Sequence, residues 1–302
     1  MAKCLIRAAV LAVSTSLAAV PSPAGLKILK KLEYGFFAGP AFSRTEASSV
    51  YRDAWAEELL KSVDEETVLS MNKAAGPAFR LTAAYFLRPR FGVEAGLSFT
   101  SAPVPTNSVF RMDYAWKSGV QGTAGGEWPG TGRFASRVFF ANAVWRHLGK
   151  RFGASLSAGP ALFFNSVKVT AIAGVGRSEV TTIQVYVPPV WTQTTVQHLD
   201  AVPAEVEIPK TRWTAAGFNA GLGGQYVLGP RLAAAVDLRL FFAPARDIPW
   251  TAVPGTYLGL LEKESRWTVG EDLARLVESR TTAFHLNPSF VQVSAGLKIA
   301  LR

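Results

Sequence analysis

The sequence contains one cysteine and three histidines among its 302 residues, and no apolar run approaches the length of a membrane-spanning helix. The single cysteine, Cys4, precedes the apolar stretch 8–20, so cleavage after that stretch would leave a chain with no cysteine. Disulfides and cysteine-ligated metal sites are then excluded. No cluster of residues has the spacing of metal ligands, and we expect neither a metal nor another cofactor.

Patterns for catalysis and nucleic-acid binding are also missing. No glycine-rich loop precedes a helix to bind phosphate, and no basic motif accompanies the net charge of +10. A lipid esterase would need a histidine close to a serine, for example His285 with a loop serine, but nothing in the sequence brings them together. We therefore expect a protein that is not an enzyme and binds no nucleic acid. A basic exported protein suits anionic lipid headgroups better.

The N-terminus has the pattern of a secretory signal. Lys3 and Arg7 precede the apolar residues 8–20, and Ala18 or Ala24 stands at a plausible cleavage position. The apolar stretch is too short to span a membrane. The pattern predicts a signal peptide over 1–24 and one mature domain over 25–302.

The rest of the chain alternates in the way that β-strands do. Residues 79–100 read as two strands joined by a tight turn at 87–90. The second strand places bulky apolar side chains on one face and small or polar ones on the other, because successive side chains leave a strand on opposite faces. The apolar face comprises Phe91, Val93, Ala95, Leu97 and Phe99.

Eight such strands are predicted, joined alternately by three tight turns and four long connections. The connections are residues 44–76, 101–132, 166–211 and 244–288. Short helices are expected at 54–63 and 271–278, an irregular segment at 101–132, and a small hairpin of 181–187 and 191–198 above the membrane. Long structureless loops are rare in compact soluble domains. The pattern predicts an all-β fold, an eight-stranded antiparallel up-and-down transmembrane β-barrel with short periplasmic turns and long extracellular loops.

Two strands, FGVEAGLSF and FGASLSAGPALFF, together with the hairpin spacing and the closing strand, carry a resemblance to a known family. In these features the chain resembles the eight-stranded outer-membrane β-barrel family, the OmpA/OmpX-like and porin-like proteins of Gram-negative bacteria. The resemblance covers about residues 33–302. It implies residence in the cell outer membrane, with the membrane lipids and the outer-membrane assembly machinery as partners. That machinery reads a C-terminal strand usually ending in an aromatic residue, whereas this chain ends in Leu301-Arg302.

Charged residues on the small face are predicted to point into the barrel. We expect Glu94 to pair with a cation, because a buried unpaired charge is costly. Two interpretations are open, a narrow ion pathway or a paired ladder that plugs the lumen. The inward charges are Arg80, Glu94, Asp237, Arg239 and Lys298.

Aromatic residues near the predicted strand ends suit a belt at the membrane interfaces, where rings that are partly polar accumulate. Ordinary core packing is the alternative. The residues are Tyr34, Tyr85, Trp145, Trp213, Tyr226 and Phe290.

Recognition would lie in the long loops, because exposed connections on a rigid scaffold carry binding function. In the connection 166–211, Tyr186 and Trp191 either contact an unknown extracellular ligand or close the barrel mouth as a hydrophobic clasp. The leading interpretation is a structural or surface-interaction protein with a plugged lumen. The alternatives are a narrow channel for small solutes and, less favoured, a soluble lipid-binding barrel.

Overall fold

In this computed structural model the structure describes residues 32–56, 60–149, 151–187, 190–249, 251–252 and 281–301. The predicted signal peptide at 1–24 and the predicted helix at 271–278 lie outside the described residues. No helix in the described ranges is long and apolar enough to cross a membrane.

Eight antiparallel strands close into a ring, which confirms the predicted all-β, eight-stranded, up-and-down barrel. Around the ring the order is β5-β4-β1-β13-β9-β8-β7-β6, and β6 pairs with β5 to close it. The strands are β1 Leu32–Ser43, β4 Ala74–Arg88, β5 Phe91–Trp116, β6 Gln121–Leu148, β7 Phe152–Val187, β8 Val190–Val227, β9 Leu232–Phe242 and β13 Phe290–Leu301.

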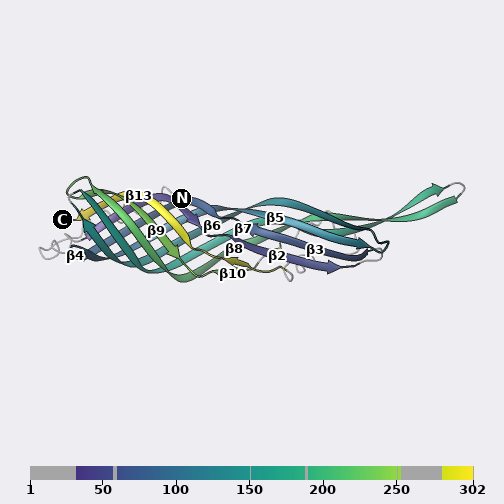
Figure 1. Cartoon of the computed structure of the whole chain (residues 1–302), viewed down its shortest axis with the longest axis horizontal. Helices are drawn as coiled ribbons and strands as arrows, with labels where there is room; N and C mark the ends of the chain where they lie inside the picture. The colour runs from purple at the N-terminus through teal and green to yellow at the C-terminus, as the bar shows by residue number, and fades with distance from the viewer. Residues whose placement is uncertain are drawn as a thin grey trace.

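The remaining strands lie outside the ring. A hairpin of β2 (Ala47–Trp55) and β3 (Leu60–Met71) pairs with the distal part of β5 through β3. Two short strands, β10 (Arg246–Ile248) and β12 (Phe284–Leu286), pair with each other, and β11 (Thr251–Ala252) pairs with β8. Together with the distal halves of β5 to β8, these strands form a long body beyond the barrel, which we call the extension (Figure 1).

The extension corrects the prediction that residues 101–132 are irregular. Residues 101–132 form the paired ends of β5 and β6, in continuous register from Ser101↔Ala135 to Ala115↔Gln121. Residues 166–187 and 190–211 belong to one hairpin of β7 and β8, which contains the small hairpin predicted from 181–187 and 191–198 and is much longer. Pairing the strands to their tips satisfies backbone hydrogen-bonding groups that an irregular loop would leave to water.

The predicted helix at 54–63 is also wrong, because residues 54–55 and 60–63 belong to the strands β2 and β3. Ala54 pairs across the hairpin with Asp64. Leu60 and Val63 are fully buried in a cluster with Phe110 and Met112. This burial stabilises the strands and overrides the local helix propensity of the segment.

Within the barrel, inward and outward positions alternate strictly. On β7 the outward positions from 152 to 164 are all apolar or small, whereas the inward positions near the turn end include Ser155 and Ser157. Inward glycines make room for the large side chains of the lumen. A Cβ at Gly96 would strike the ring of Phe140, and one at Gly221 would lie 3.0 Å from Nε of Arg239.

Candidate functional site

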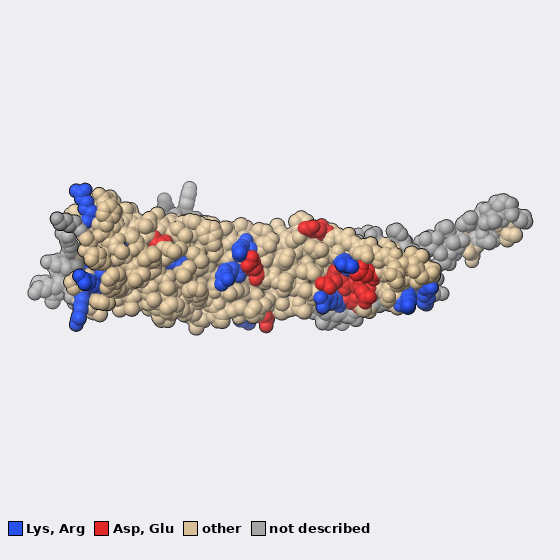
Figure 2. Space-filling view, in the orientation of Figure 1, with Lys and Arg blue, Asp and Glu red and all other residues tan. Residues whose placement is uncertain are grey.

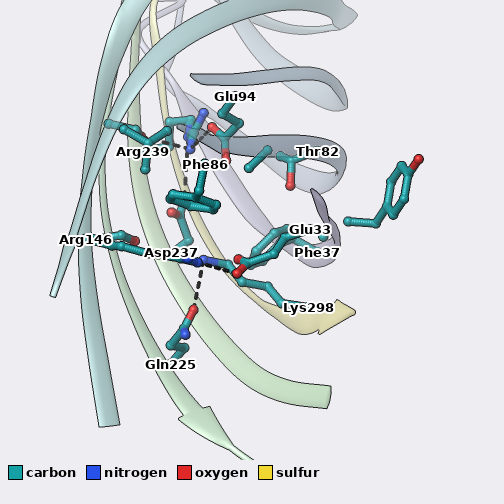
Figure 3. A pocket seen from close by; sticks show the side chains of 16 residues that line it. Glu33, Phe37, Thr82, Phe86, Glu94, Arg146, Gln225, Asp237, Arg239 and Lys298 are labelled. Atoms are coloured by element: carbon teal, nitrogen blue, oxygen red, sulfur yellow. Dashed lines mark hydrogen bonds and ion pairs between the residues drawn. The ribbon is translucent and has the colours of Figure 1, made fainter. Parts of the chain in front are cut away.

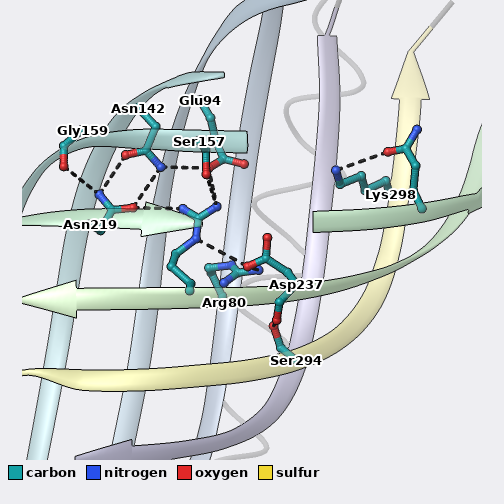
Figure 4. A network of polar contacts seen from close by, with 11 residues as sticks. Arg80, Glu94, Asn142, Ser157, Gly159, Asn219, Asp237, Ser294 and Lys298 are labelled. Atoms are coloured by element: carbon teal, nitrogen blue, oxygen red, sulfur yellow. Dashed lines mark hydrogen bonds and ion pairs between the residues drawn. The ribbon is translucent and has the colours of Figure 1, made fainter. Parts of the chain in front are cut away.

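The lumen holds a network of charged and amide side chains centred on Arg239 of β9 (Figure 4). Its Nη2 lies 2.9 Å from Oε1 of Glu94 and donates to Oγ of Ser157 at 3.1 Å. Glu94 is on β5, which stands four strands from β9 in either direction around the ring. This ion pair therefore joins opposite walls of the barrel, and both side chains are buried, at 2% and 11% exposure.

A second ion pair extends the network. Nη2 of Arg80, on β4, lies 2.6 Å from Oδ2 of Asp237 on β9, and the Arg80 side chain is fully buried. The same carboxylate oxygen is 3.5 Å from Nε of Arg239, so Asp237 stands between two cations. Both guanidinium groups also lie over aromatic rings, Arg80 over Phe37 at 4.4 Å and Arg239 over Phe140 at 4.7 Å. Cation–π contacts of this kind add stabilisation where the charge is desolvated.

Two asparagines complete the layer. Asn142 of β6 and Asn219 of β8 exchange amide hydrogen bonds of 3.0 and 2.8 Å, and Asn142 also donates to Glu94 at 3.2 Å. The inward parity of both residues is visible in the sequence, but amides carry no charge and were not selected as site residues. Asn142 thus holds the Glu94 carboxylate, while Asn219 accepts a hydrogen bond of 3.3 Å from Nη1 of Arg239.

Nearer the short turns, a second group of polar residues lines the lumen (Figure 3). Glu33 forms an ion pair with Arg146, whose guanidinium lies over the ring of Phe86. Nζ of Lys298 donates to Oε1 of Gln225 at 3.3 Å. The cavity that these residues share has a volume of about 20 Å³. That is room for about one water molecule, so the polar lumen is nearly filled.

The sequence prediction included Lys298 but missed Glu33 and Arg146. Both fall at the margins of the predicted strands. Glu33 immediately precedes the first predicted strand, and Arg146 immediately follows another. The predicted strands therefore assign neither residue to an inward or outward face. The structure extends both strands by at least one residue, which turns these side chains into the lumen.

An aromatic layer lies on the other side of the charged network. The rings of Phe241 and Phe290 stack at 4.5 Å, and Phe140 and Phe163 meet Phe241 edge-on at 6.0 and 6.3 Å. All four are nearly inaccessible to solvent. The lumen is thus closed twice, by ion pairs and by packed rings.

Two of the six predicted interface aromatics, Phe290 and Trp213, are wrong. Phe290 is 1% exposed inside the lumen, and Trp213 is 6% exposed and packs against Phe134 at 6.5 Å in the interior. The reason is that residues an even number of positions apart on a strand lie on the same face. Trp213 shares the inward face with Asn219, and Phe290 shares it with Gln292.

The other four predicted aromatics lie on the outer face near the short turns. Tyr34, Tyr85 and Trp145 occupy outward positions of β1, β4 and β6. Tyr226 of β8 packs beside the 71% exposed ring of Phe152, with centroids 5.0 Å apart. This placement suits a belt at one membrane interface.

The predicted recognition residues lie at the tip of the longest hairpin. Tyr186 and Trp191 are paired positions on β7 and β8, next to the end of the hairpin in Figure 1. Their side chains lie outside the described part of the chain, so a role in binding stays a prediction.

The extension carries an acidic surface, seen as the red patch in Figure 2. Cross-strand ion pairs join Arg52 to Glu66 at 3.0 Å, and Arg111 pairs with Asp113 on the same strand at 3.0 Å. Hydrogen bonds from Thr123 and then Arg111 lower the pKa of Asp113 below its ordinary value. Among the described residues no group of three or more potential ligands is arranged to hold a metal ion.

Solved structures that are similar to this chain are outer-membrane proteins of low sequence identity. Neisserial surface protein A is 10% identical, with a TM-score of 0.32, and the match covers 88% of this chain and 96% of that one. Ail of Yersinia pestis is 10% identical, with a TM-score of 0.31 and coverage of 88% and 98%. The protease OmpT from Escherichia coli is 9% identical, with a TM-score of 0.38 and coverage of 90% and 97%. No protein-family model and no curated protein matches the sequence.

Proposed function

We propose that this chain is an integral outer-membrane barrel with a closed lumen, whose work is structural or done by surface interactions of its extension. The outer face of the barrel supports the membrane position. Large apolar side chains point outward and are well exposed, including Leu222 at 55%, Val236 at 62% and Val93 at 51%. A soluble barrel would expose polar side chains there, which opposes the lipid-binding alternative.

The height of this apolar surface suits a bilayer. On β7 it runs from Phe152 to Phe164, and at the usual strand rise and barrel tilt this span covers about 30 Å of membrane thickness. Figure 2 shows the same contrast, since the barrel surface in that view is mostly uncharged while charges gather at the turn end and over the extension. Insertion would use the outer-membrane assembly machinery.

The observation that carries the proposed function is the Glu94–Arg239 ion pair between opposite walls of the lumen. Together with the stacked rings of Phe241 and Phe290, it blocks the route that a solute would take. A barrel closed in this way does no transport, and its accessible surface is the extension. The β7–β8 hairpin continues for about 65 Å beyond Val167, far enough to present its tip well clear of the membrane.

Planar-bilayer conductance of the refolded protein tests this proposal. Heat-modifiable gel mobility first establishes that the barrel is folded. We expect a folded species that enters bilayers and shows no discrete conductance steps. Stable, ion-selective steps in the wild-type protein would contradict the closed lumen, and a protein that stays in solution without lipid would contradict the membrane position.

A narrow channel is the second candidate, favoured by the charged lining near the turns, where Glu33, Arg146 and Lys298 share one small cavity. For conduction the Glu94–Arg239 pair would have to open. Replacement of both residues, Glu94→Gln with Arg239→Gln, removes the charges that hold the walls together. If the channel interpretation holds, wild-type steps are present and their ion selectivity changes in the double variant.

A further inference from the structure

Five basic side chains gather on the outer face of β6, β7 and β8. All are exposed and all occupy outward positions. The register places them together, with Arg133 directly opposite Lys168, and Arg212 opposite Ser166. Directly opposite side chains on neighbouring strands lie about 5 Å apart at Cβ. The outer basic patch consists of Arg133, Arg137, Lys168, Lys210 and Arg212.

The patch begins where the apolar surface of the barrel ends. Arg137 is paired with Phe99 on one side and with Phe164 on the other. Phe164 meets Phe139, the next outward residue of β6, edge-on at 5.6 Å. Toward the turns, the outward positions of β6 that follow Phe139 are uncharged as far as Trp145. The basic groups therefore stand at the boundary between the lipid-facing surface and the extension.

No acidic side chain of the described residues forms an ion pair with the patch. Within the described part of the chain, none of the five side chains forms an ion pair or a hydrogen bond with another residue. Glu207, opposite Thr170, is the nearest described carboxylate by register, two positions beyond Lys168. Other exposed charges do form ion pairs, as in Arg52–Glu66 and Lys73–Glu46.

The patch lies on one side of the barrel. On β5 the residue opposite Arg133 is Pro103, and the residue beside it on the same outward face is Ser101. Pro40 and Pro77 pair at the distal ends of β1 and β4. The cations next to these ends are Arg44 and Lys73, and Lys73 pairs with Glu46 at 3.3 Å. A general preference for charge at the membrane boundary would distribute cations evenly, so five cations without ion pairs on three adjacent strands point to a localised ligand.

We propose that the outer basic patch binds the phosphate headgroup of a lipid in the outer leaflet, with the acyl chains lying against the phenylalanines below it. The argument is one of complementarity. Arginine side chains bind phosphate oxygens bidentately, and several cations at one site select a highly charged phosphate. Phe139 and Phe164 supply the adjoining apolar surface. The assignment rests on the proposed membrane position, because only that position brings headgroups to this height.

Native mass spectrometry of the folded protein from mixed micelles tests the assignment. The probes are phosphatidic acid and phosphatidylcholine with identical acyl chains, in a neutral detergent. We expect the wild-type protein to retain phosphatidic acid preferentially. In the variant Arg133→Gln with Lys168→Gln, affinity for phosphatidic acid should fall about 25-fold, since each basic residue near an anionic headgroup contributes about fivefold. Retention of phosphatidylcholine should not change.

The matched control is Lys61→Gln with Arg246→Gln, which removes the same residue types from exposed positions outside the patch. It should bind phosphatidic acid like the wild type. Equal retention of both lipids by the wild type, or an equal loss in both variants, would overturn the assignment, and so would competition by inorganic phosphate as effective as that by phosphatidic acid. Failure of the folded protein to enter phosphatidylcholine nanodiscs would instead overturn the membrane position.

Discussion

The barrel and the extension share four strands but have opposite interiors. In the barrel part of β6, Asn142 points inward and Trp145 outward, whereas near the extension Phe134 points inward and Arg133 outward. The alternation does not change phase between the two parts, since even positions of β6 face inward throughout. What changes is whether the side chains on each face are polar or apolar. Polarity switches on both faces within a few residues, at Arg137 outside and between Asn142 and Phe140 inside.

The difference shows that the surroundings of each part determine its core. In lipid the outside is apolar, and the inside of a narrow barrel holds polar groups that satisfy one another. In water the exterior is polar and the core is apolar, as in the cluster around Phe134 and Ile208. One continuous strand can serve both environments because its backbone hydrogen bonds are made within the sheet.

The substitution with the largest expected effect removes a charge from the polar core of the barrel. Arg239→Gln removes the cation that contacts Glu94 and leaves Asn142 as a hydrogen-bond donor to that carboxylate. Removing one partner of a buried ion pair costs about 3–5 kcal/mol. The measurement is the free energy of unfolding in lipid vesicles by urea titration, followed by gel mobility. The double variant with Glu94→Gln should lose less than the sum of the single losses. A cost below about 1 kcal/mol for Arg239→Gln would show that the pair is solvated.

The aromatic layer is the place where apolar packing begins inside the barrel. Phe241→Ala removes the ring that contacts Phe140, Phe163 and Phe290, and should cost about 3–5 kcal/mol. Phe152→Ala, at an exposed outward position, is the control and should cost less. The same unfolding titration compares them. Equal costs would mean that Phe241 does not pack in a closed layer.

Introducing a charge on the outer face tests directly whether the barrel and the extension have different surroundings. Leu238 of the barrel and Val109 of the extension point outward with similar exposure, 41% and 46%. Leu238→Arg should destabilise the protein by about 2–4 kcal/mol in a bilayer. Val109→Arg should change stability by no more than about 0.5 kcal/mol. Equal effects in the urea titration would remove the distinction between a lipid-facing and a water-facing surface.

The smallest expected effect concerns pH and belongs to the extension alone. The lowered pKa of Asp113 means that its contacts with Thr123 and Arg111 contribute stability above the ordinary carboxyl pKa of 3.8. That contribution is lost as the pH falls through the lowered pKa. Titration of the Asp113 carboxyl by NMR should show a lower midpoint than in Thr123→Val. The same midpoint in both proteins would exclude the Thr123 hydrogen bond as the cause.

Much of the barrel could be predicted because strand alternation is local. The parity of each strand was enough to assign Arg80, Glu94, Asp237 and Arg239 to one face, and the structure places all four in the lumen. The same parity puts Trp213 and Phe290 inside, but proximity to strand ends was given more weight there. The aromatic layer was missed because a polar lumen was expected along the whole barrel.

The extension could not be predicted in the same way. Residues 121–130 are rich in glycine, which favours turns over strands in isolation, and residues 54–63 have a helical pattern. Their strand conformation depends on partners far away in the chain. The segment 121–130 pairs with β5, and Leu60 and Val63 are buried against Phe110.

The sequence by itself determined the strand count, the antiparallel connectivity and the face on which each barrel side chain lies, because these follow from a period of two read along short segments. Tertiary structure alone decided which charges pair across the lumen, where apolar packing replaces them, and how far the strands continue beyond the barrel. Those properties depend on residues brought together from opposite walls, such as Glu94 and Arg239, whose separation is set by closure of the ring.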